Sequence, residues 1–398
     1  GELEATQFST TTKLKGVTNW VFGAAAFNGD NSEAKDQTLG GTSFSYNLAL
    51  NLETSFTGKD LLYTRLRSGN VEGVYGGLFG QEYAINTSDA LKVNRLYYSF
   101  PVGDFTIVGG PVVRQDDMLP VWPSAYPSDM TYDFFTYAGA PGAYNLALGG
   151  GAGVYYTTGD WSISTSYLST NANSSCADNR ANKCGDTTAT PAETDISGGF
   201  MTDAAGSNAT TQIAYAPDNW GVAVAYTYSS GENGVGLYAA NATSKAEAAF
   251  AAGVTNSYGV SGWWMPEESG LIPSISAGIG QSFTDAASAT GSSTDINYES
   301  TSWYVGLEWD DAFIDGNSLG FAFGQPTWVS KVTGDDKVAT TDYEDDPGYA
   351  FEVFYKFSVT DNITVTPALT YLSKPYSDSA ADNEISAFSG LVKTTFKF

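Results

Sequence analysis

Histidine is absent from the 398 residues of this chain, and basic residues are scarce. There are 18 lysines and arginines against 44 aspartates and glutamates, which gives a formal net charge of −26. Without histidine the chain has no Ser-His-Asp or Cys-His catalytic pair and no histidine-based metal site. The acidity disfavours a nucleic-acid partner, because the phosphate backbone would be repelled. We therefore expect neither an enzyme nor a nucleic-acid-binding protein.

Long hydrophobic runs are also missing. No stretch approaches the roughly 18 apolar residues that a membrane-spanning helix needs. Charged residues make up only 16% of the chain, whereas an ordinary soluble domain has roughly 25%. Hydrophobic residues reach 42% and aromatic residues 14%, which excludes a disordered chain. The composition is that of a folded protein poor in charge and rich in aromatic rings.

Cysteine occurs only twice, as Cys176 and Cys184 at the two ends of a short polar segment. This spacing predicts a local disulfide formed in an oxidising compartment, with two free thiols as the alternative. Residues Gly1–Glu4 do not resemble a secretion signal, so we expect that such a signal was removed or that the chain lies within a longer precursor.

Apolar and polar residues alternate with period two through most of the chain. In the segment 43–56, Leu48 and Leu50 share a face with aromatic residues, while Asn47 and Asn51 lie on the opposite face. This pattern predicts β-strands with one apolar face. Aromatic residues gather at the ends of the apolar faces, and such girdles are typical of a membrane barrel. A soluble β-sandwich, in which these faces pack into a core, is the alternative.

Sixteen strands are predicted, near 17–27, 43–56, 60–68, 92–101, 103–113, 147–158, 160–170, 207–217, 219–229, 254–265, 270–283, 298–309, 317–329, 348–360, 361–373 and 386–398. Short turns alternate with long polar connections such as 28–42 and 69–91. This alternation predicts the all-β class: a transmembrane, antiparallel, up-and-down β-barrel with short periplasmic turns and long extracellular loops. It places the chain in a Gram-negative outer membrane with both termini in the periplasm.

The domain organisation follows from these strands. Residues 1–16 form a periplasmic lead-in segment, and residues 17–398 form the barrel. A final strand that ends in Phe398 resembles the insertion signal of outer-membrane proteins. Pro367 lies inside a predicted strand, where it removes a backbone donor, so we expect a bulge there or a misplaced strand. Residues 246–252 favour a short helix on an outer loop.

A barrel of sixteen strands is too wide to be filled by its own side chains, so it forms an aqueous channel unless another segment folds in. The candidate is the loop after the fifth strand, near 114–146. It carries an unusual number of apolar residues: Met118, Leu119, Val121, Trp122, Tyr126, Met130, Tyr132, Phe134, Phe135 and Tyr137. We expect this loop to fold inward and narrow the pore. A loop that contacts another subunit is the alternative.

Charges support a pore constriction at this loop. Four of the five arginines lie between positions 65 and 114, as Arg65, Arg67, Arg95 and Arg114. They are predicted to face an acidic side made by Asp116, Asp117, Asp129 and Asp133. Rows of opposite charge across a constriction select solutes by size, charge and dipole. The alternative is that the arginines pair with these carboxylates and only hold the loop in place.

Other charges and rings are predicted to face the lumen. Glu53, Glu308, Glu352 and Lys356 fall on the non-aromatic faces of their strands. Tyr63, Tyr97 and Tyr304 are candidate rings for stacking on sugars. The acidic outer loop around 335–346 would attract cations or bind a calcium ion, although a simple solvated loop is the alternative. We predict no other metal and no cofactor.

The opening segment, from Leu3 to Gly16, runs directly into a strand. It resembles the same phrase in the cyanobacterial major outer-membrane porins, which are also called Som-type or iron-uptake porins and are related to the carbohydrate-selective OprB group. In that family the phrase follows a surface-layer-homology domain and a coiled coil, so the chain resembles the barrel portion only. The resemblance implies a homotrimer among outer-membrane lipids and lipopolysaccharide, attached to the cell wall through the missing N-terminal domain.

The favoured function is a porin that lets inorganic ions and small hydrophilic solutes diffuse passively, with cations preferred because the chain is acidic. A sugar-selective porin is the alternative within this class. A secreted β-rich adhesin or lectin is the alternative from another class, and its stability without detergent would distinguish it. A barrel enzyme is disfavoured by the lack of histidine.

Overall fold

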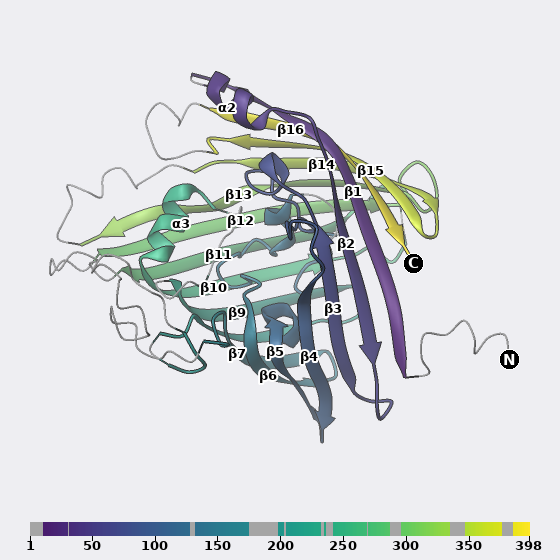
Figure 1. Ribbon diagram of the computed structural model, residues 1–398, viewed down its shortest axis with the longest axis vertical. Helices are drawn as coiled ribbons and strands as arrows, with labels where there is room; N and C mark the ends of the chain where they lie inside the picture. The colour runs from purple at the N-terminus through teal and green to yellow at the C-terminus, as the bar shows by residue number, and fades with distance from the viewer. Residues whose placement is uncertain are drawn as a thin grey trace.

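The computed structural model describes residues 11–30, 32–127, 132–174, 198–202, 204–231, 235, 242–268, 270–286, 296–334, 347–375 and 385–398. Within these residues, 16 strands form one closed barrel in which each strand pairs with its neighbours in sequence. All pairs are antiparallel, and β1 closes the barrel against β16. Figure 1 shows consecutive strands side by side around the wall. The predicted all-β, antiparallel, up-and-down barrel is confirmed.

The strands coincide with the predicted ones to within a few residues, except that β1 begins inside the segment expected as a lead-in. Their bounds are β1 Thr12–Asn28, β2 Ser43–Thr54, β3 Leu61–Gly69, β4 Lys92–Val102, β5 Phe105–Arg114, β6 Leu148–Thr158, β7 Trp161–Ser169 and β8 Ser207–Tyr215. The second half comprises β9 Trp220–Ser230, β10 Gly253–Trp264, β11 Ser274–Ala286, β12 Ile296–Asp310, β13 Ser318–Thr333, β14 Ala350–Thr360, β15 Ile363–Ser373 and β16 Ser386–Lys397.

The outer face of the barrel is apolar, and exposure alternates along each strand. In β9, Val222 and Val224 are exposed while Ala223 and Ala225 are buried against the interior. Outward-facing aromatic residues pack against each other, as the half-buried Phe323 does on the exposed Phe351 with ring centroids 4.5 Å apart. A continuous apolar belt of this kind is satisfied by hydrocarbon and not by water. The apolar faces therefore do not form the core of a sandwich.

Pro367 lies within β15, as predicted, and the strand is not misplaced. It stays in register with Val392 of β16. On the other side, the pairing of β14 with β15 has a gap between Phe354 and Phe357, opposite Thr366 and Pro367. The missing N–H of proline is therefore accommodated by a local interruption of one ladder.

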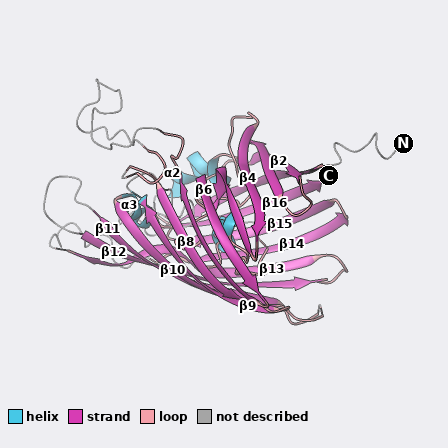
Figure 2. Ribbon diagram, turned by 90° about the horizontal axis from the view of Figure 1, so that it is seen from below, coloured by secondary structure: helices cyan, strands magenta, loops and turns pink. Residues whose placement is uncertain are grey.

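Helices are confined to the connections, as Figure 2 shows. The predicted helix at 246–252 is α3, Ser244–Ala251. Thr243 caps its N-terminus, because the Thr243 hydroxyl accepts a hydrogen bond from Ala246 N (3.3 Å). A second helix, α2 (Ser32–Leu39), was not predicted. Neither helix is long and apolar enough to cross a bilayer, nor is any other helix in the described part of the chain.

The loop between β5 and β6, residues 115–127 and 132–147, packs along the interior of the barrel. We call it the first inner loop. Its backbone carbonyls accept hydrogen bonds from inward-facing hydroxyls: Ser261 Oγ donates to Ala138 O (2.7 Å) and Ser302 Oγ to Gly139 O (2.8 Å). The strands β8 to β12 present mainly Ser, Thr, Gly and Ala to it, so the loop backbone reaches the wall directly.

A second loop also folds inward, which the sequence analysis did not predict. The connection 70–91, expected as a polar outer loop, buries Tyr75, Phe79 and Tyr83 completely or almost so. We call it the second inner loop. The hydroxyl of Tyr75 donates to Gly390 O of β16 (2.8 Å), and the ring of Tyr83 lies 4.7 Å from the ammonium of Lys393. Its aromatic residues are therefore withdrawn from water.

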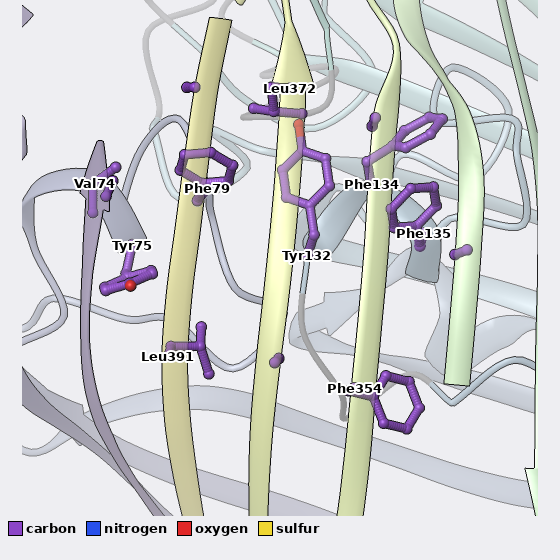
Figure 3. Packing of buried hydrophobic residues seen from close by; sticks show 14 of the residues in the cluster. Val74, Tyr75, Phe79, Tyr132, Phe134, Phe135, Phe354, Leu372 and Leu391 are labelled. Atoms are coloured by element: carbon purple, nitrogen blue, oxygen red, sulfur yellow. The ribbon is translucent and has the colours of Figure 1, made fainter. Parts of the chain in front are cut away.

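The two inner loops contact each other. Asp133 N donates to Gly80 O (2.8 Å), and the rings of Phe79 and Tyr132 lie 6.4 Å apart. Figure 3 shows Phe79, Tyr132 and the neighbouring Phe134 and Phe135 gathered over strands that carry Leu372 and Leu391. The largest apolar cluster of the described residues thus lies inside the barrel, between the loops and the wall formed by β12 to β16 and β1.

A charge on the outer face should destabilise the barrel. Val224 lies near the middle of β9 and is 53% exposed. Replacing it by arginine should lower the free energy of unfolding by about 2–4 kcal/mol, because the charge enters hydrocarbon. Denaturant titration in lipid vesicles measures the change. V224A removes apolar atoms without adding charge and should cost much less; equal costs would contradict an outward-facing, lipid-exposed position.

A side chain at Gly278 should displace the first inner loop. A Cβ built there overlaps the carbonyl oxygen of Ala138, so G278V forces the loop away from the wall at a cost of about 1–3 kcal/mol. Limited proteolysis should then cut within residues 132–147, which should resist cleavage in the wild type. G41A is the control, because no atom lies within 4 Å of a Cβ at Gly41. Unchanged resistance of G278V would refute the packing.

Candidate pore constriction

The four arginines meet on one side of the interior because their strands are neighbours. Arg65 and Arg67 lie on the inner face of β3, and Arg65 is opposite Arg95 in the β3–β4 register. Arg114 is the last residue of β5. Side chains directly opposite each other in an antiparallel pair lie within about 5.5 Å at Cβ, so the register itself concentrates positive charge. The sequence-predicted basic wall is thus brought together in space.

Asp116 and Asp117 lie beside these arginines and not across the interior from them. Both belong to η2 (Gln115–Met118), the turn that directly follows β5. Asp117 Oδ2 lies 2.8 Å from Arg95 Nε, and Asp116 receives two hydrogen bonds from Arg114, at 2.5 Å each. Asp116 and Asp117 therefore pair with Arg114 and Arg95, as the alternative interpretation of these charges expected. Because the acids follow β5 immediately, they cannot reach the opposite wall.

Arg67 and Arg65 have no carboxylate partner among the described residues. Arg67 is 7% exposed; its Nη2 donates to Asn47 Oδ1 (2.8 Å) and to Tyr83 O of the second inner loop (2.6 Å). The half-buried Arg65 forms neither a hydrogen bond nor an ion pair with any residue that the structure describes. Its charge is thus compensated least within the cluster.

Glu82 is a further member that sequence reasoning missed. The second inner loop brings it to a cavity of about 260 Å³, which is lined by Glu82, Arg114, Asp116, Leu119, Trp122, Thr136 and Leu146. The cavity lies between the two inner loops and the end of β5. A glutamate in a glycine-rich loop carries no sequence signal of its function, because its position depends on where the whole loop folds.

Burial and neighbouring charges shift the pKa values of these loop acids. Burial acts to raise the pKa of Asp116, but the adjacent Arg114 guanidinium prevails and lowers it below the usual range. Burial, reinforced by the negative charge of Asp116, raises the pKa of Asp117. Burial also raises the pKa of Glu82, against the opposing effect of Arg114 and Arg67. In total, the cluster contains four guanidinium groups and three carboxyl groups.

Asp133 belongs to a different part of the interior. It begins η3 (Asp133–Thr136) and lines a cavity of about 600 Å³ with residues of the second inner loop, α3 and the ends of β14 and β15.

Several features expected from the sequence lie outside the described residues: Asp129, Cys176, Cys184 and the acidic segment 335–346. Among the residues that are described, no group of three or more acidic or cysteine side chains could hold a metal ion.

Tyr63 and Tyr97 lie next to the arginines, on the inner faces of β3 and β4. Their ring centroids are 5.3 Å apart, with 32° between the ring planes. Both rings are half-buried. Glu53, on the inner face of β2, forms an ion pair with Lys15 of β1 (2.7 Å). These residues extend the lining of the interior beyond the arginine cluster.

Tyr304 and Glu352 face inward as predicted, but the first inner loop covers them. Each is only 1% exposed; Tyr304 Oη lies 2.7 Å from Ser124 Oγ, and Glu352 accepts hydrogen bonds from the loop. They therefore do not line open space. Glu308 and Lys356, also inward-facing, are half-buried, and Glu308 lies with Asp218 and Asp310 around a cavity at the short turns.

Comparisons with known proteins agree with this architecture. A model of the carbohydrate-selective porin, OprB family, matches residues 141–398. An uncharacterised Nostoc protein is 28% identical over 427 residues, covering 100% of this chain and 67% of that protein. An uncharacterised Synechocystis protein is 28% identical over 426 residues, with 100% of this chain and 70% of that protein covered.

Solved structures share the fold. OprB of Pseudomonas putida at high pH has a TM-score of 0.58 at 14% identity, covering 98% of this chain and 94% of that chain. An anion-selective porin of Comamonas acidovorans gives 0.56 at 9% identity, with 98% and 99% covered. OmpT of Vibrio cholerae, in its trimer form, gives 0.52 at 8% identity, with 98% and 100% covered. Because the family model covers well over half of the chain, this chain belongs to the OprB family of carbohydrate-selective porins and is an outer-membrane porin.

Proposed function

We propose that this porin is a passive diffusion channel for inorganic ions and small hydrophilic solutes, narrowed where the first inner loop and Glu82 lie beside the arginine cluster. The observation that carries the proposal is the cavity shared by Glu82, Arg114, Asp116 and Trp122 inside a closed barrel with an apolar exterior. The loops pack against the interior from β8 to β16, and we place the remaining passage beside the arginines of β3 to β5.

Two charge distributions act on a permeating ion in opposite directions. The chain as a whole carries a net charge of −26, which attracts cations to the mouths of the channel. The described constriction has four arginines and three acids, an excess of one positive charge. We propose that the overall acidity prevails and that cations are preferred, with Arg65 limiting that preference.

The sugar-selective alternative has one specific support. Tyr63 and Tyr97 present two half-buried rings beside the arginines, and aromatic rings next to hydrogen-bond donors are suited to a sugar, which has apolar faces and hydroxyl edges. The family description also names carbohydrates. Under this alternative, a sugar should interrupt the ion current.

We further propose a homotrimer in the outer membrane, with the short turns and both chain ends toward the periplasm. The trimer form of the structurally similar OmpT supports this assembly. In this orientation the outer wall contacts lipid and the lipopolysaccharide leaflet, and a cell-wall attachment would lie on the periplasmic side.

Planar-bilayer recordings test the channel directly. Purified protein should give stepwise open currents without any ligand, and the reversal potential in a KCl gradient should indicate cation preference. This preference should weaken as salt rises, because the Debye length falls from about 10 Å at 0.1 M to about 3 Å at 1 M. Anion preference at low salt would contradict the proposed dominance of the acidic mouths. Neutral sugars added to the bath test the sugar-selective alternative.

Arg65 should influence selectivity without holding the structure together. R65A removes the least compensated charge of the constriction, so conductance should change and the reversal potential should shift toward stronger cation preference. K356A, which removes a positive charge from the inner face of β14, is the control and should shift it less. R67A should instead lower the free energy of unfolding by about 1.5–3 kcal/mol, because Asn47 and Tyr83 lose a charged donor. Identical reversal potentials for R65A and the wild type would place Arg65 away from the conduction path.

A further inference from the structure

Arg65 and Asn51 are neighbouring polar residues on the inner wall whose hydrogen-bonding groups are not satisfied by the protein. They are register partners on β3 and β2, so their Cβ atoms lie roughly 5 Å apart. Arg65 Nε, a donor, and Asn51 Oδ1, an acceptor, are both buried and have no hydrogen-bond partner in the described part of the chain. Buried polar atoms are nearly always hydrogen-bonded. Two adjacent exceptions of opposite sense therefore indicate a ligand that both accepts and donates hydrogen bonds.

The charge of Arg65 sets the chemistry of such a ligand. The other arginines of the cluster are each held by a carboxylate or by neutral acceptors. Glu53, two residues from Asn51 on β2, pairs with Lys15 (2.7 Å). Arg65 forms no ion pair with any residue that the structure describes, and a half-buried charge without a counter-charge is costly. The planar fork of guanidinium donors matches a carboxylate.

Two tyrosine rings lie beside this pair on the same wall. Tyr63 precedes Arg65 by two residues, so both side chains point to the interior, and Tyr63 is opposite Tyr97 in the β3–β4 register. Their ring centroids are 5.3 Å apart, and both rings are half-buried. Tyr97 also packs against the apolar cluster that contains Val108 and Met118. The ring pair is therefore held in place and can pack on the apolar face of a sugar.

The register places these groups within reach of one small molecule. Asn51 and Arg65 belong to one row of register partners, and Tyr63 and Tyr97 belong to the next inward-facing row. Inward-facing residues that follow each other along a strand are roughly 7 Å apart, which is comparable with the length of one hexose. Ring packing, hydroxyl recognition and carboxylate recognition are thus available to a single monosaccharide.

We propose that these four side chains form a binding site for a sugar acid, a monosaccharide that carries a carboxylate. The carboxylate accepts hydrogen bonds from Arg65, a hydroxyl donates to Asn51 Oδ1, and the sugar ring packs on the tyrosines. This inference rests on the proposed diffusion channel and names a solute class for it. A neutral sugar would leave the guanidinium without a counter-charge, and a simple carboxylate would leave the rings and Asn51 without a partner.

The acidity of the whole chain gives this site a role in selection. The net charge of −26 opposes the entry of any anion, and Arg65 offsets that repulsion for a solute that fits beside it. An anion without a sugar ring gains only the guanidinium contact. The site therefore favours one class of anion in a channel that otherwise prefers cations.

Current block in planar bilayers tests the site with the full chain and three probes. D-Glucuronate has the ring and the carboxylate, D-glucose has the ring alone, and acetate has the carboxylate alone. In about 1 M KCl the Debye length is about 3 Å, so charge at the mouths is screened. Glucuronate should interrupt the single-channel current at a concentration about tenfold lower than either partial probe, because a hydrogen bond to a charged group is worth about that factor. Equal potency of glucose or of acetate overturns the inference, because it indicates a neutral-sugar site or a simple anion site.

Three variants assign the parts of the site. R65Q keeps hydrogen-bond donors and removes the charge, so glucuronate should lose its advantage over glucose while block by glucose stays unchanged. Y63A removes one ring and should weaken glucose and glucuronate alike, with acetate unaffected. K356Q is the matched control, because it removes a positive charge from the inner face of β14, which is separated from β2 by β1, β16 and β15; block by all three probes should stay unchanged. A glucuronate advantage that survives in R65Q refutes the role of Arg65.

Binding measured apart from conduction separates failure of the site from failure of the channel. Isothermal titration calorimetry of the full chain in detergent should give a glucuronate affinity that R65Q lowers about tenfold. A wild type without open current overturns the diffusion channel, and calorimetry still decides the site. A conducting wild type that binds glucuronate no more tightly than both partial probes overturns the site alone. If R65Q does not fold, as judged from its circular dichroism spectrum, the ranking of the three probes on the wild type decides.

Discussion

The structure depends on one constraint: a closed sheet in a bilayer has hydrocarbon on one face and a hydrated interior on the other. Because strand side chains alternate between faces, every second residue must be apolar. Strand β9 follows this alternation, with Val222 and Val224 exposed and Ala223 and Ala225 buried. Closure leaves no unpaired edge strand. The interruption of the β14–β15 pairing beside Pro367 is tolerated because the ladder to β16 continues.

The width of the barrel creates a second requirement. Sixteen strands enclose more space than their own side chains fill, and two inner loops occupy part of it. The wall accommodates them with glycine, serine and threonine where the first inner loop lies flat, as at Gly278 and Ser261. On the β14 side it offers a carboxylate, Glu352, and an ammonium, Lys393, to loop tyrosines. The loops are therefore held by polar contacts as well as by aromatic packing.

The arginine cluster of the proposed constriction follows from the barrel register combined with these loops. Neighbouring strands bring Arg65 and Arg95 together, a repulsive arrangement that the acids of η2 offset at Arg95 and Arg114. Glu82 enters from the second inner loop. The charge of this cluster is thus only partly compensated, with one more arginine than acids, while the excess acidity of the chain lies elsewhere. In the proposed channel, this separation would let the mouths and the arginine cluster act differently on the same solute.

The sequence by itself determined the strands, the apolar outer face, the short helix α3 and the inward direction of Arg65, Arg67 and Glu352, because alternation is a local property of consecutive residues. The tertiary structure alone decided that Asp116 and Asp117 pair with adjacent arginines, that Tyr304 and Glu352 are covered, and that the connection 70–91 folds inward. Loops have no period from which their destination can be deduced. Their positions depend on contacts between residues far apart in the chain, such as Tyr75 with Gly390 and Tyr126 with Glu352.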